Sequence, residues 1–281
     1  RSTIIRCSAR SFSLLYSSPA RRSSLMISSE RGRKMFCDDE VLCLLEKNNE
    51  LCWIDKVHSN PDIVDIQNII DQLKGKSFNS IIAFGGGSVI DSAKAINLAL
   101  CKELHEYSLA ELISDPRIHN NVPPPPLYTI PTTAGTGGEV TPFATIWDHA
   151  KFQKLSLSGP SVFSNTAIID PVLTYDLPEK DTIFTGLDAI NQAMESIWNK
   201  NANTTSTKYA MEAITMILFN VEELKKNPNN VKIRNKIIIA ANKAGLAFSN
   251  TKTAAAHSIS YPLTQYYGIP HGIAASMSLI P

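Results

Sequence analysis

Four residues in the C-terminal third of the chain carry side chains that can bind a metal ion. Asp188 and Gln192 lie four positions apart, which places both on one face of a helix. His257 and His271 lie fourteen positions apart with a glycine and a proline between them, so they belong to different elements. One carboxylate and two imidazoles can form a facial ligand set with open positions, which suits Fe(II) and can also hold Zn(II). Spacing alone equally allows these residues to be ordinary surface or core side chains.

A glycine-rich turn that could bind phosphate follows the short apolar run Ile81–Phe84. It consists of three glycines, Gly85–Gly87, and is followed by Ser88 and Asp91. Successive glycines let the backbone approach a phosphate, and a helix N-terminus presents free N–H groups and a partial positive charge. The turn therefore predicts a pyrophosphate site, although the glycines could also form only a tight turn. Ser88 and Asp91 have the spacing of a capping box, which would close the helix start with or without a ligand.

A second polar loop, Pro131–Thr141, follows the strand-like run Leu127–Ile130. Its threonines can donate hydrogen bonds to phosphate or ribose, between glycines that do not crowd a cofactor. A loop that simply faces solvent is the alternative. Because each glycine-rich loop follows a strand, we expect both to face one crevice at the carboxyl edge of a parallel sheet.

The elements that must position these residues change character along the chain. Between residues 25 and 100, short apolar runs alternate with amphipathic stretches, which is typical of βα units around a mostly parallel sheet. The strands are predicted at Leu25–Ile27, Leu51–Ile54 and Ile81–Phe84, and the helices at Lys34–Leu45, Ile63–Leu73 and Val89–Leu100.

After residue 171 the pattern becomes helical, with helices predicted at residues 181–200, 205–224, 232–248 and 253–261. The predicted fold is therefore an α/β N-terminal dinucleotide-binding domain with a mostly parallel sheet over residues 25–176. An all-α metal-binding domain over residues 177–281 is predicted to follow it.

The composition excludes several classes of protein. With 43% hydrophobic and 19% charged residues among 281, the chain can bury a sizeable core. A formal net charge of +1 gives no electrostatic basis for binding nucleic acid or an anionic membrane, and no apolar run is long enough to span a membrane. The five cysteines form no C-x-x-C pair, which favours a reducing compartment and hence a cytoplasmic protein.

Residues 1–24 are predicted to be an extension that precedes the fold. Residues 1–29 contain five arginines and ten serines but no acid, a composition typical of a transit peptide and therefore compatible with a mitochondrial location. The alternative is a disordered extension with no targeting role.

Four short motifs, taken together, match the signature of one enzyme family. Residues 85–94 read GGGSVIDSAK, residues 130–141 read IPTTAGTGGEVT, residues 186–189 read GLDA, and His257 is followed by Pro-His-Gly at 270–272. These motifs resemble the iron-containing (type III) alcohol dehydrogenase family, which has a dehydroquinate synthase-like fold. The resemblance covers about residues 25–281. It also implies a helical domain that is incomplete at its C-terminal end, because members usually continue with further helices.

The resemblance implies a role for each matched residue. Asp188, His257 and His271 would bind the metal, with Gln192 as a fourth, neutral and weaker ligand where most members have histidine. The residues implied to bind the nicotinamide cofactor are Glu30, Gly86, Gly87, Ser88, Asp91, Thr132, Thr133 and Lys154. An acid near the adenosine ribose disfavours a 2′-phosphate, so Glu30 argues for NAD, whereas Arg31 and Arg33 could accommodate NADP.

The implied function is that of a metal-dependent, NAD(P)-linked alcohol dehydrogenase or aldehyde reductase. Residues 256–264 and 267–272, with Gln192 and Glu195–Trp198, look most like the phosphonoacetaldehyde reductase branch. Hydride would pass between the nicotinamide and a small aldehyde such as phosphonoacetaldehyde. A divalent metal with one carboxylate ligand leaves a charge near +1, which would suit an anionic aldehyde. Tyr261 and His271 are the candidate catalytic residues, with Tyr261 or a metal-bound water as proton donor.

Two other functions remain open at this level. One is a general aliphatic alcohol or glycerol dehydrogenase, and the other is a non-catalytic nucleotide-binding relative, weakened by Gln192 and by truncation. The resemblance further implies a homodimer.

Overall fold

The structure, a computed structural model, describes residues 3–6, 23–39, 43, 46–47 and 50–279. The chain divides by its internal contacts into two compact units, the first made of residues 1–131 and 142–170 and the second of residues 132–141 and 171–281. The sequence pattern placed one boundary near residue 176. The contacts place the change at residue 171 and group the loop 132–141 with the second unit.

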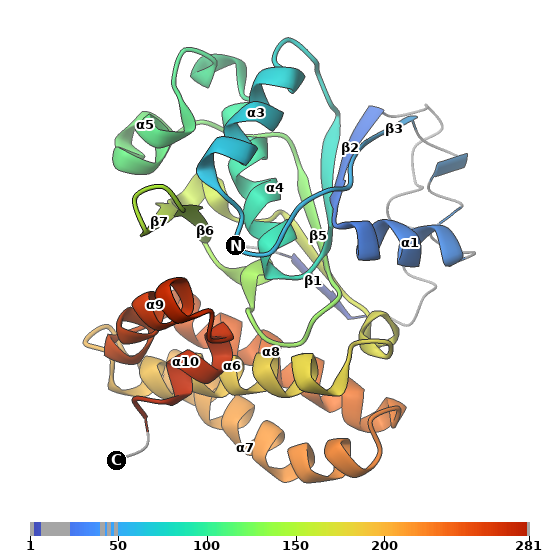
Figure 1. Ribbon diagram of the computed structural model, residues 1–281, viewed down its shortest axis with the longest axis vertical. Coiled ribbons are helices and arrows are strands. Elements are labelled where there is room, and N and C mark those ends of the chain that lie inside the picture. The colour runs from blue at the N-terminus through green and yellow to red at the C-terminus, as the bar shows by residue number, and fades with distance from the viewer. Residues whose placement is uncertain (1–2, 7–22, 40–42, 44–45, 48–49, 280–281) are drawn as a thin grey trace. The chain divides into compact units, whose positions relative to one another are not determined.

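The first unit is built on a six-stranded parallel sheet (Figure 1). The carboxyl ends of the strands therefore share one edge, and the prediction of a mostly parallel α/β domain is confirmed. The chain passes from β2 to β3 and then returns to β4 on the other side of β2, so the strand order reverses between β2 and β4. The strands lie in the order β1 (Thr3–Arg6), β8 (Thr166–Ile169), β5 (Leu127–Pro131), β4 (Ser80–Gly85), β2 (Ser23–Ser28) and β3 (Glu50–Ile54).

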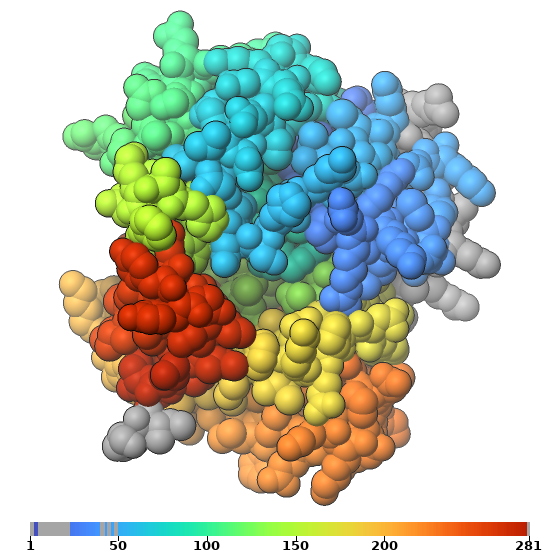
Figure 2. Space-filling model, in the orientation of Figure 1, coloured from blue at the N-terminus to red at the C-terminus, as the bar shows by residue number. Residues whose placement is uncertain are grey.

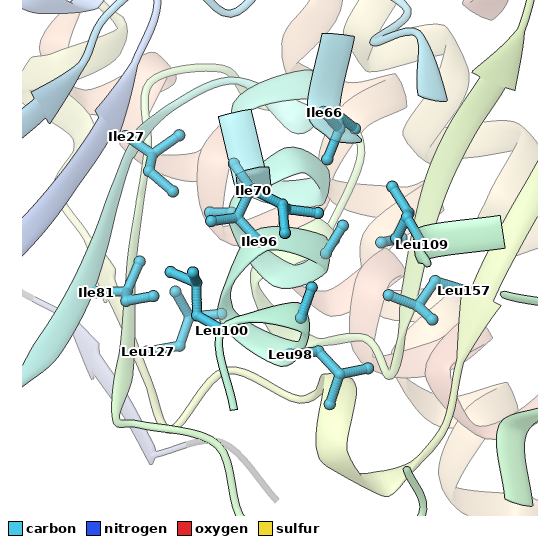
Figure 3. Packing of buried hydrophobic residues seen from close by; sticks show 14 of the residues in the cluster. Ile27, Ile66, Ile70, Ile81, Ile96, Leu98, Leu100, Leu109, Leu127 and Leu157 are labelled. Carbon is cyan, nitrogen blue, oxygen red and sulfur yellow. The ribbon is translucent and has the colours of Figure 1, made fainter. Parts of the chain in front are cut away.

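Helix α4 (Gly87–Ala99) lies at the centre of the core of this unit. Ten of its thirteen residues are buried, because it packs on β2, β4 and β5 and also against α3 and β6. Figure 3 shows its Ile96 among Ile27, Ile70, Ile81 and Leu127. The other elements of the unit are α1 (Glu30–Asp38), α3 (Ile63–Leu73), α5 (Leu109–Ser114) and the antiparallel hairpin of β6 (Phe143–Asp148) and β7 (Gln153–Ser158), with 3-10 turns at Lys102–Leu104, Pro116–Ile118 and Pro160–Val162.

Helix α1 begins four residues earlier than its predicted start at Lys34. Ser29 precedes the helix and its hydroxyl accepts a hydrogen bond from the Gly32 N–H at 3.2 Å, so the side chain caps the first turn. The predicted helix extends to Leu45, but residues 40–42 and 44–45 lie outside the described residues.

The predicted capping box at Ser88 and Asp91 is wrong. Gly86 is the residue that precedes α4, so Ser88 already lies inside the helix. Its hydroxyl accepts a hydrogen bond from the Asn60 N–H at 3.3 Å, and Asp91 accepts one from the Thr145 N–H at 3.0 Å. Both side chains therefore serve contacts with other elements that a local pattern does not contain.

The edge strand β1 comes from the segment 1–24 that composition set apart as an extension. Its four residues, Thr3–Arg6, pair in parallel with β8, and the Thr3 N–H donates to the carbonyl of Asn165 at 2.9 Å. Residues 7–22 of that segment lie outside the described residues. At least these four residues thus take part in the sheet.

The second unit is all-helical in its described residues, apart from the loop 132–141 with a 3-10 turn at Gly138–Val140, as the sequence predicted. Its three long helices, α6, α7 and α8, pack on one another. Helices α9 and α10 form one continuous part of the surface, red in Figure 2. A 3-10 turn at Pro171–Thr174 precedes them. The helices are α6 (Glu179–Trp198), α7 (Thr204–Lys226), α8 (Val231–Thr251), α9 (Ala255–Tyr267) and α10 (His271–Ser276).

Helix α9 continues past the proline at which it was predicted to end. Pro262 lacks the N–H that would bond to the carbonyl of Ser258, but both residues are exposed, so water can satisfy that carbonyl. The helix ends instead at Gly268, whose φ of 65° is left-handed and favours glycine. Among the described residues, no helix combines the length and apolar character needed to cross a membrane.

A buried arginine connects the start of the second unit to its helices. Arg234 on α8 is 2% exposed, and its guanidinium donates to the carbonyls of Pro228, Thr174 and Leu177 and to the hydroxyl of Thr182 at 2.6–3.2 Å. One side chain thereby satisfies three backbone carbonyls of the segment that leads into α6 and of the turn before α8.

Replacing Arg234 with methionine should destabilise the protein by about 3 kcal/mol, because these buried acceptors lose their donor. Urea-induced unfolding measures the change. The matched control is Lys232→Met, an exposed position on the same helix, which should change stability by less than about 0.5 kcal/mol. Equal midpoints for the two variants would contradict the role assigned to Arg234.

Candidate metal centre and cofactor site

Three of the four predicted metal ligands come together within the second unit. The candidate ligand atoms of Asp188, His257 and His271 all lie within 4.8 Å of one another. Asp188 Oδ1 is 3.3 Å from His257 Nε2 and 3.7 Å from His271 Nε2. Donor atoms around a tetrahedral ion with bonds of about 2.1 Å stand about 3.4 Å apart. These separations therefore fit a shared divalent cation, held by one residue each from α6, α9 and α10.

Gln192, the fourth predicted ligand, contacts Asp188 one helical turn away. Its Nε2 donates to Asp188 Oδ2 at 2.9 Å. Its Oε1 is buried and has no hydrogen-bond partner among the described residues. A buried amide oxygen without a donor costs about 1–3 kcal/mol, and a cation within reach would remove that cost. Gln192 thus orients Asp188, and its carbonyl oxygen is a candidate fourth donor.

Glu195 is a residue of this centre to which sequence reasoning gave no role. It is completely buried on α6, and its Oε2 forms a short hydrogen bond with Nδ1 of His257. Its Oε1 accepts from the N–H of Ala256 at 2.7 Å and from the N–H of His257 at 3.4 Å. The signal in the sequence was its spacing, because seven residues after Asp188 is two helical turns and so the same face.

The charges around His257 support one another. Burial disfavours the imidazolium form of His257, but hydrogen bonds with Asp188 and Glu195 and their charges outweigh burial and raise its pKa to about 9. Burial likewise opposes ionisation of Glu195, but the hydrogen bond and charge of His257, with two backbone N–H groups, lower the pKa of this carboxyl.

The charge near +1 expected for the occupied site counts Asp188 alone, because it is the one carboxylate among the candidate ligands. Glu195 adds a second buried carboxylate next to the same imidazole. With a divalent cation and neutral histidines, the formal charges then sum to zero. On this count the cation and the two carboxylates would carry no net formal charge that could attract an anionic aldehyde.

A close contact between α10 and α6 places His271. A Cβ added to Gly272 would lie 2.0 Å from the carbonyl oxygen of Phe184, so only glycine permits this approach. Asn191 on α6 donates to the Gly272 carbonyl at 3.3 Å and to the Ser276 hydroxyl at 2.9 Å. These contacts hold the first turn of α10, which carries His271, against α6.

Tyr261, the predicted proton donor, lies beside His271. The two rings are nearly parallel, with an interplanar angle of 12° and centroids 6.1 Å apart. The hydroxyl of Ser260 lies 3.5 Å from Nδ1 of His271. Both predicted catalytic residues are therefore neighbours, and both are half-buried.

The first glycine turn lies at the carboxyl end of β4, beside the point where the strand order reverses. Open α/β sheets bind ligands in the crevice at such a point. Within the described chain no side chain caps the start of α4, so N–H groups of its first turn can meet an anion. Gly86, Gly87 and Ser88 are all half-buried. Gly85 has a packing role, because a Cβ there would lie 2.6 Å from the side chain of Val89.

Asp91 faces the β6–β7 hairpin. Burial raises the pKa of Asp91 to about 6, against the opposing effects of Lys94, the Thr145 N–H and Lys154. Lys94 is itself 1% exposed and donates to the Phe143 carbonyl at 2.7 Å. Asp91 and Lys94 thus hold β6 on α4, and the charge of Lys154 acts on Asp91.

The second glycine loop carries Thr132, which is buried, and Thr133, which is half-buried. Both follow β5 directly in the chain but are grouped with the second unit. A Cβ on Gly135 would lie 2.4 Å from a side-chain atom of α6, and one on Gly137 would lie 2.4 Å from Cα of Gly245 on α8. Two glycines that were interpreted as space for a cofactor are therefore required by packing against helices.

Glu30 is the first residue of α1 and is exposed just beyond the carboxyl end of β2. Arg33, which could have accommodated a 2′-phosphate, hydrogen-bonds Glu46 at 3.2 Å and lies 3.7 Å above the ring centre of Trp53. Its guanidinium is thus engaged by the carboxylate of Glu46 and the ring of Trp53.

Comparison with known proteins agrees with this architecture. Residues 6–171 match the model of the iron-containing alcohol dehydrogenase family, and residues 182–281 match the C-terminal model of the Fe-containing alcohol dehydrogenase family. The chain therefore belongs to the iron-containing alcohol dehydrogenase family, as the sequence motifs indicated.

Three curated relatives illustrate the range of activities. The chain is 34% identical over 223 residues (78% of this chain, 54% of the relative) to the probable alcohol dehydrogenase EutG of Escherichia coli. It is 32% identical to the sulfoacetaldehyde reductase of Bilophila wadsworthia (77% and 54%) and 31% identical to the phosphonoacetaldehyde reductase of Streptomyces viridochromogenes (79% and 57%). The chain spans about half the length of these relatives.

Solved structures share the fold. An iron-containing alcohol dehydrogenase is 29% identical, with a TM-score of 0.87 over 99% of this chain and 75% of that one. The sulfoacetaldehyde reductase of Bifidobacterium kashiwanohense, solved in complex with NAD+, is 27% identical, with a TM-score of 0.86 over 99% and 73%.

Gly272→Ala should destabilise the protein by about 2 kcal/mol, because the added methyl group would force α10 away from α6. The matched control is Gly186→Ala on α6, where a Cβ meets nothing within 4 Å, and where the change should raise stability by about 0.5–1 kcal/mol. Urea unfolding measures both. A tolerated Gly272→Ala would show that the contact is not restrictive.

The raised pKa of Asp91 predicts that the contribution of this residue to stability falls between about pH 4 and 6. Its ordinary pKa is 3.8, so in this range the folded state holds a proton that the unfolded chain has released, and the slope of stability against pH is negative. The loss complete above pH 6 is about 3 kcal/mol.

Urea unfolding between pH 4 and 7 checks this prediction by comparing the wild type with Asp91→Asn, which should lack this part of the decline. Asp65→Asn, at an exposed site on α3, is the control and should follow the wild type. A difference between wild type and Asp91→Asn that stays constant with pH contradicts it.

Proposed function

We propose that this protein is a metal-dependent, NAD(P)-linked alcohol dehydrogenase or aldehyde reductase that acts on small aldehydes and the corresponding alcohols. The observation that carries the proposal is the convergence of Asp188, His257 and His271 from three helices, in a chain of the iron-containing alcohol dehydrogenase family. Fe(II) is the proposed metal because the family is named for it, and Zn(II) suits the same nitrogen and oxygen donors.

The proposed reaction needs two groups that the chain itself does not supply, a divalent cation and a nicotinamide cofactor. When bound, a divalent cation would polarise the substrate oxygen, and a nicotinamide would exchange a hydride with the adjacent carbon. Asp188, His257 and His271 would hold the cation, and Gln192 would orient Asp188 and offer its own oxygen. Tyr261 would donate a proton to the substrate oxygen during reduction, because a phenol O–H is a hydrogen-bond donor.

The cofactor site is proposed at the switch point between β2 and β4. The N–H groups at Gly86, Gly87 and Ser88 would bind the pyrophosphate, with Glu30 at the end of the neighbouring strand near the ribose. NAD is favoured over NADP because Arg33 is engaged by Glu46 and Trp53. The roles proposed for Thr132, Thr133 and Lys154 depend on the family motifs.

Phosphonoacetaldehyde is the first substrate to test, because a phosphonoacetaldehyde reductase and a sulfoacetaldehyde reductase are among the relatives. The charge balance at the metal does not add to this argument. Other relatives carry the names of a choline dehydrogenase and a methanol dehydrogenase, so a general aliphatic alcohol dehydrogenase is the main alternative within the enzymes.

The test is NADH and NADPH oxidation by the purified protein after reconstitution with Fe(II) or Zn(II). We expect one bound metal per chain and activity with a small aldehyde, both lost in Asp188→Ala, with a fall in rate of about 100-fold or more. Glu179→Ala, an exposed acid at the start of the same helix, is the control and should retain both.

The outcomes separate the candidate functions. Faster turnover of phosphonoacetaldehyde than of butyraldehyde would support the anionic substrate, and equal turnover would favour a general alcohol dehydrogenase. A protein that binds NADH but neither metal nor aldehyde would be a non-catalytic nucleotide-binding relative. This is the alternative outside the enzymes, and the uncharged Gln192 is the observation that favours it.

A further inference from the structure

We propose that Glu195 is a positioning residue that fixes the tautomer and orientation of His257, so that Nε2 of this imidazole is the nitrogen that binds the metal. The inference rests on the proposed function, because it requires a cation at Asp188, His257 and His271. It adds a residue that neither the spacing of the ligands nor the family motifs had assigned a role.

The first argument is the hydrogen bonding of the imidazole. An ionised carboxylate only accepts hydrogen bonds, so the contact between Glu195 Oε2 and His257 Nδ1 keeps a proton on Nδ1. Nε2 faces Asp188 Oδ1 at 3.3 Å and is therefore the nitrogen whose lone pair can serve a cation. A metal-binding histidine usually donates its other N–H to a carboxylate or carbonyl in this way, which orients the ring and raises its basicity.

The second argument is the start of α9, which Glu195 also holds. In the described chain the residue before α9, Ala254, makes no side-chain cap. Glu195 Oε1 instead accepts from the N–H groups of Ala256 and His257, the second and third residues of the helix. A carboxylate at this position is favoured by the free N–H groups and by the helix dipole. One side chain from α6 thus restrains both the backbone and the imidazole of His257.

Spacing on α6 makes this double restraint possible. Asp188 and Glu195 are separated by two helical turns and face the same side, and each contacts a different nitrogen of His257. Because both carboxylates belong to one helix, the backbone of α6 fixes the spacing between them. The imidazole of His257 is held between these two carboxylates.

Glu195→Gln distinguishes positioning from simple helix capping. Glutamine has the same volume, and its carbonyl oxygen can still accept from the two backbone N–H groups, so the cap is retained. Its NH2 group would then face Nδ1 and donate to it, which moves the proton of the neutral ring to Nε2, where it blocks the metal. Turning the amide around would instead place the NH2 group against two N–H donors.

The experiment measures Zn(II) affinity by competition with a chelator, and the electronic spectrum of the Co(II)-substituted protein as a signature of ligand geometry. We expect Glu195→Gln to lose roughly 10- to 100-fold in Zn(II) affinity and to change the Co(II) spectrum. The matched control is Glu139→Gln. Glu139 is 4% exposed in the same unit and accepts from Asn242 Nδ2 at 2.9 Å, so it tests the loss of a buried carboxylate elsewhere and should leave both readouts unchanged.

Unchanged affinity and spectrum in a folded Glu195→Gln would overturn the inference and leave Glu195 as a cap. If the variant does not fold, as judged by thermal unfolding without metal, 15N chemical shifts of His257 in the Zn(II)-loaded wild type decide. A protonated Nδ1 with a metal-bound Nε2 supports positioning, and the reverse tautomer contradicts it. The proposed function itself fails if the wild type binds no metal, or if Asp188→Ala does not abolish metal binding. That result is distinct from a failure of the inference about Glu195.

Discussion

Two carboxylates buried on one face of α6 connect this helix to the start of α9. Burying an ionised carboxylate is costly unless it is paired and hydrogen-bonded. Asp188 and Glu195 meet this requirement with the same residue, His257, and Glu195 adds two backbone N–H groups. The start of α9 must therefore lie against α6, and α10 follows it through the close approach of Gly272. The geometry that suits a cation is in this sense a consequence of how two buried charges are compensated.

The same compensation bears on substrate and metal. Gln192 carries no charge, and its buried Oε1, which has no hydrogen-bond partner among the described residues, is a candidate neutral donor. With a divalent ion bound and both histidines neutral, the formal charges of the ion, Asp188 and Glu195 would sum to zero. A preference for charged or uncharged aldehydes would then have to come from groups outside the ligand set.

In the first unit, backbone N–H groups stay accessible at the start of a largely buried helix, α4. Helix α4 is enclosed by strands and neighbouring helices along most of its length, yet its first turn remains half-buried at the carboxyl edge of the sheet. Asp91 and Lys94, which a local pattern assigned to capping and to a family motif, instead attach the β6–β7 hairpin to this helix. The hairpin thus packs against the side of α4, and within the described chain no side chain caps the N-terminus of this helix.

The amino-acid sequence by itself determined the strands β2, β4 and β5, the long helices of the second unit and the candidate ligands, because periodicity, glycine turns and family motifs are local signals. It did not predict β1, whose four residues gain stability only by pairing with β8 more than 150 positions away. It also did not show that Gly135 and Gly137 pack against helices, or that Glu195 hydrogen-bonds His257. Nor did it show that Gly86, and not Ser88, is the residue that precedes α4. Each of these depends on a partner distant in the chain, and only the tertiary structure decides which buried polar groups are left to satisfy one another.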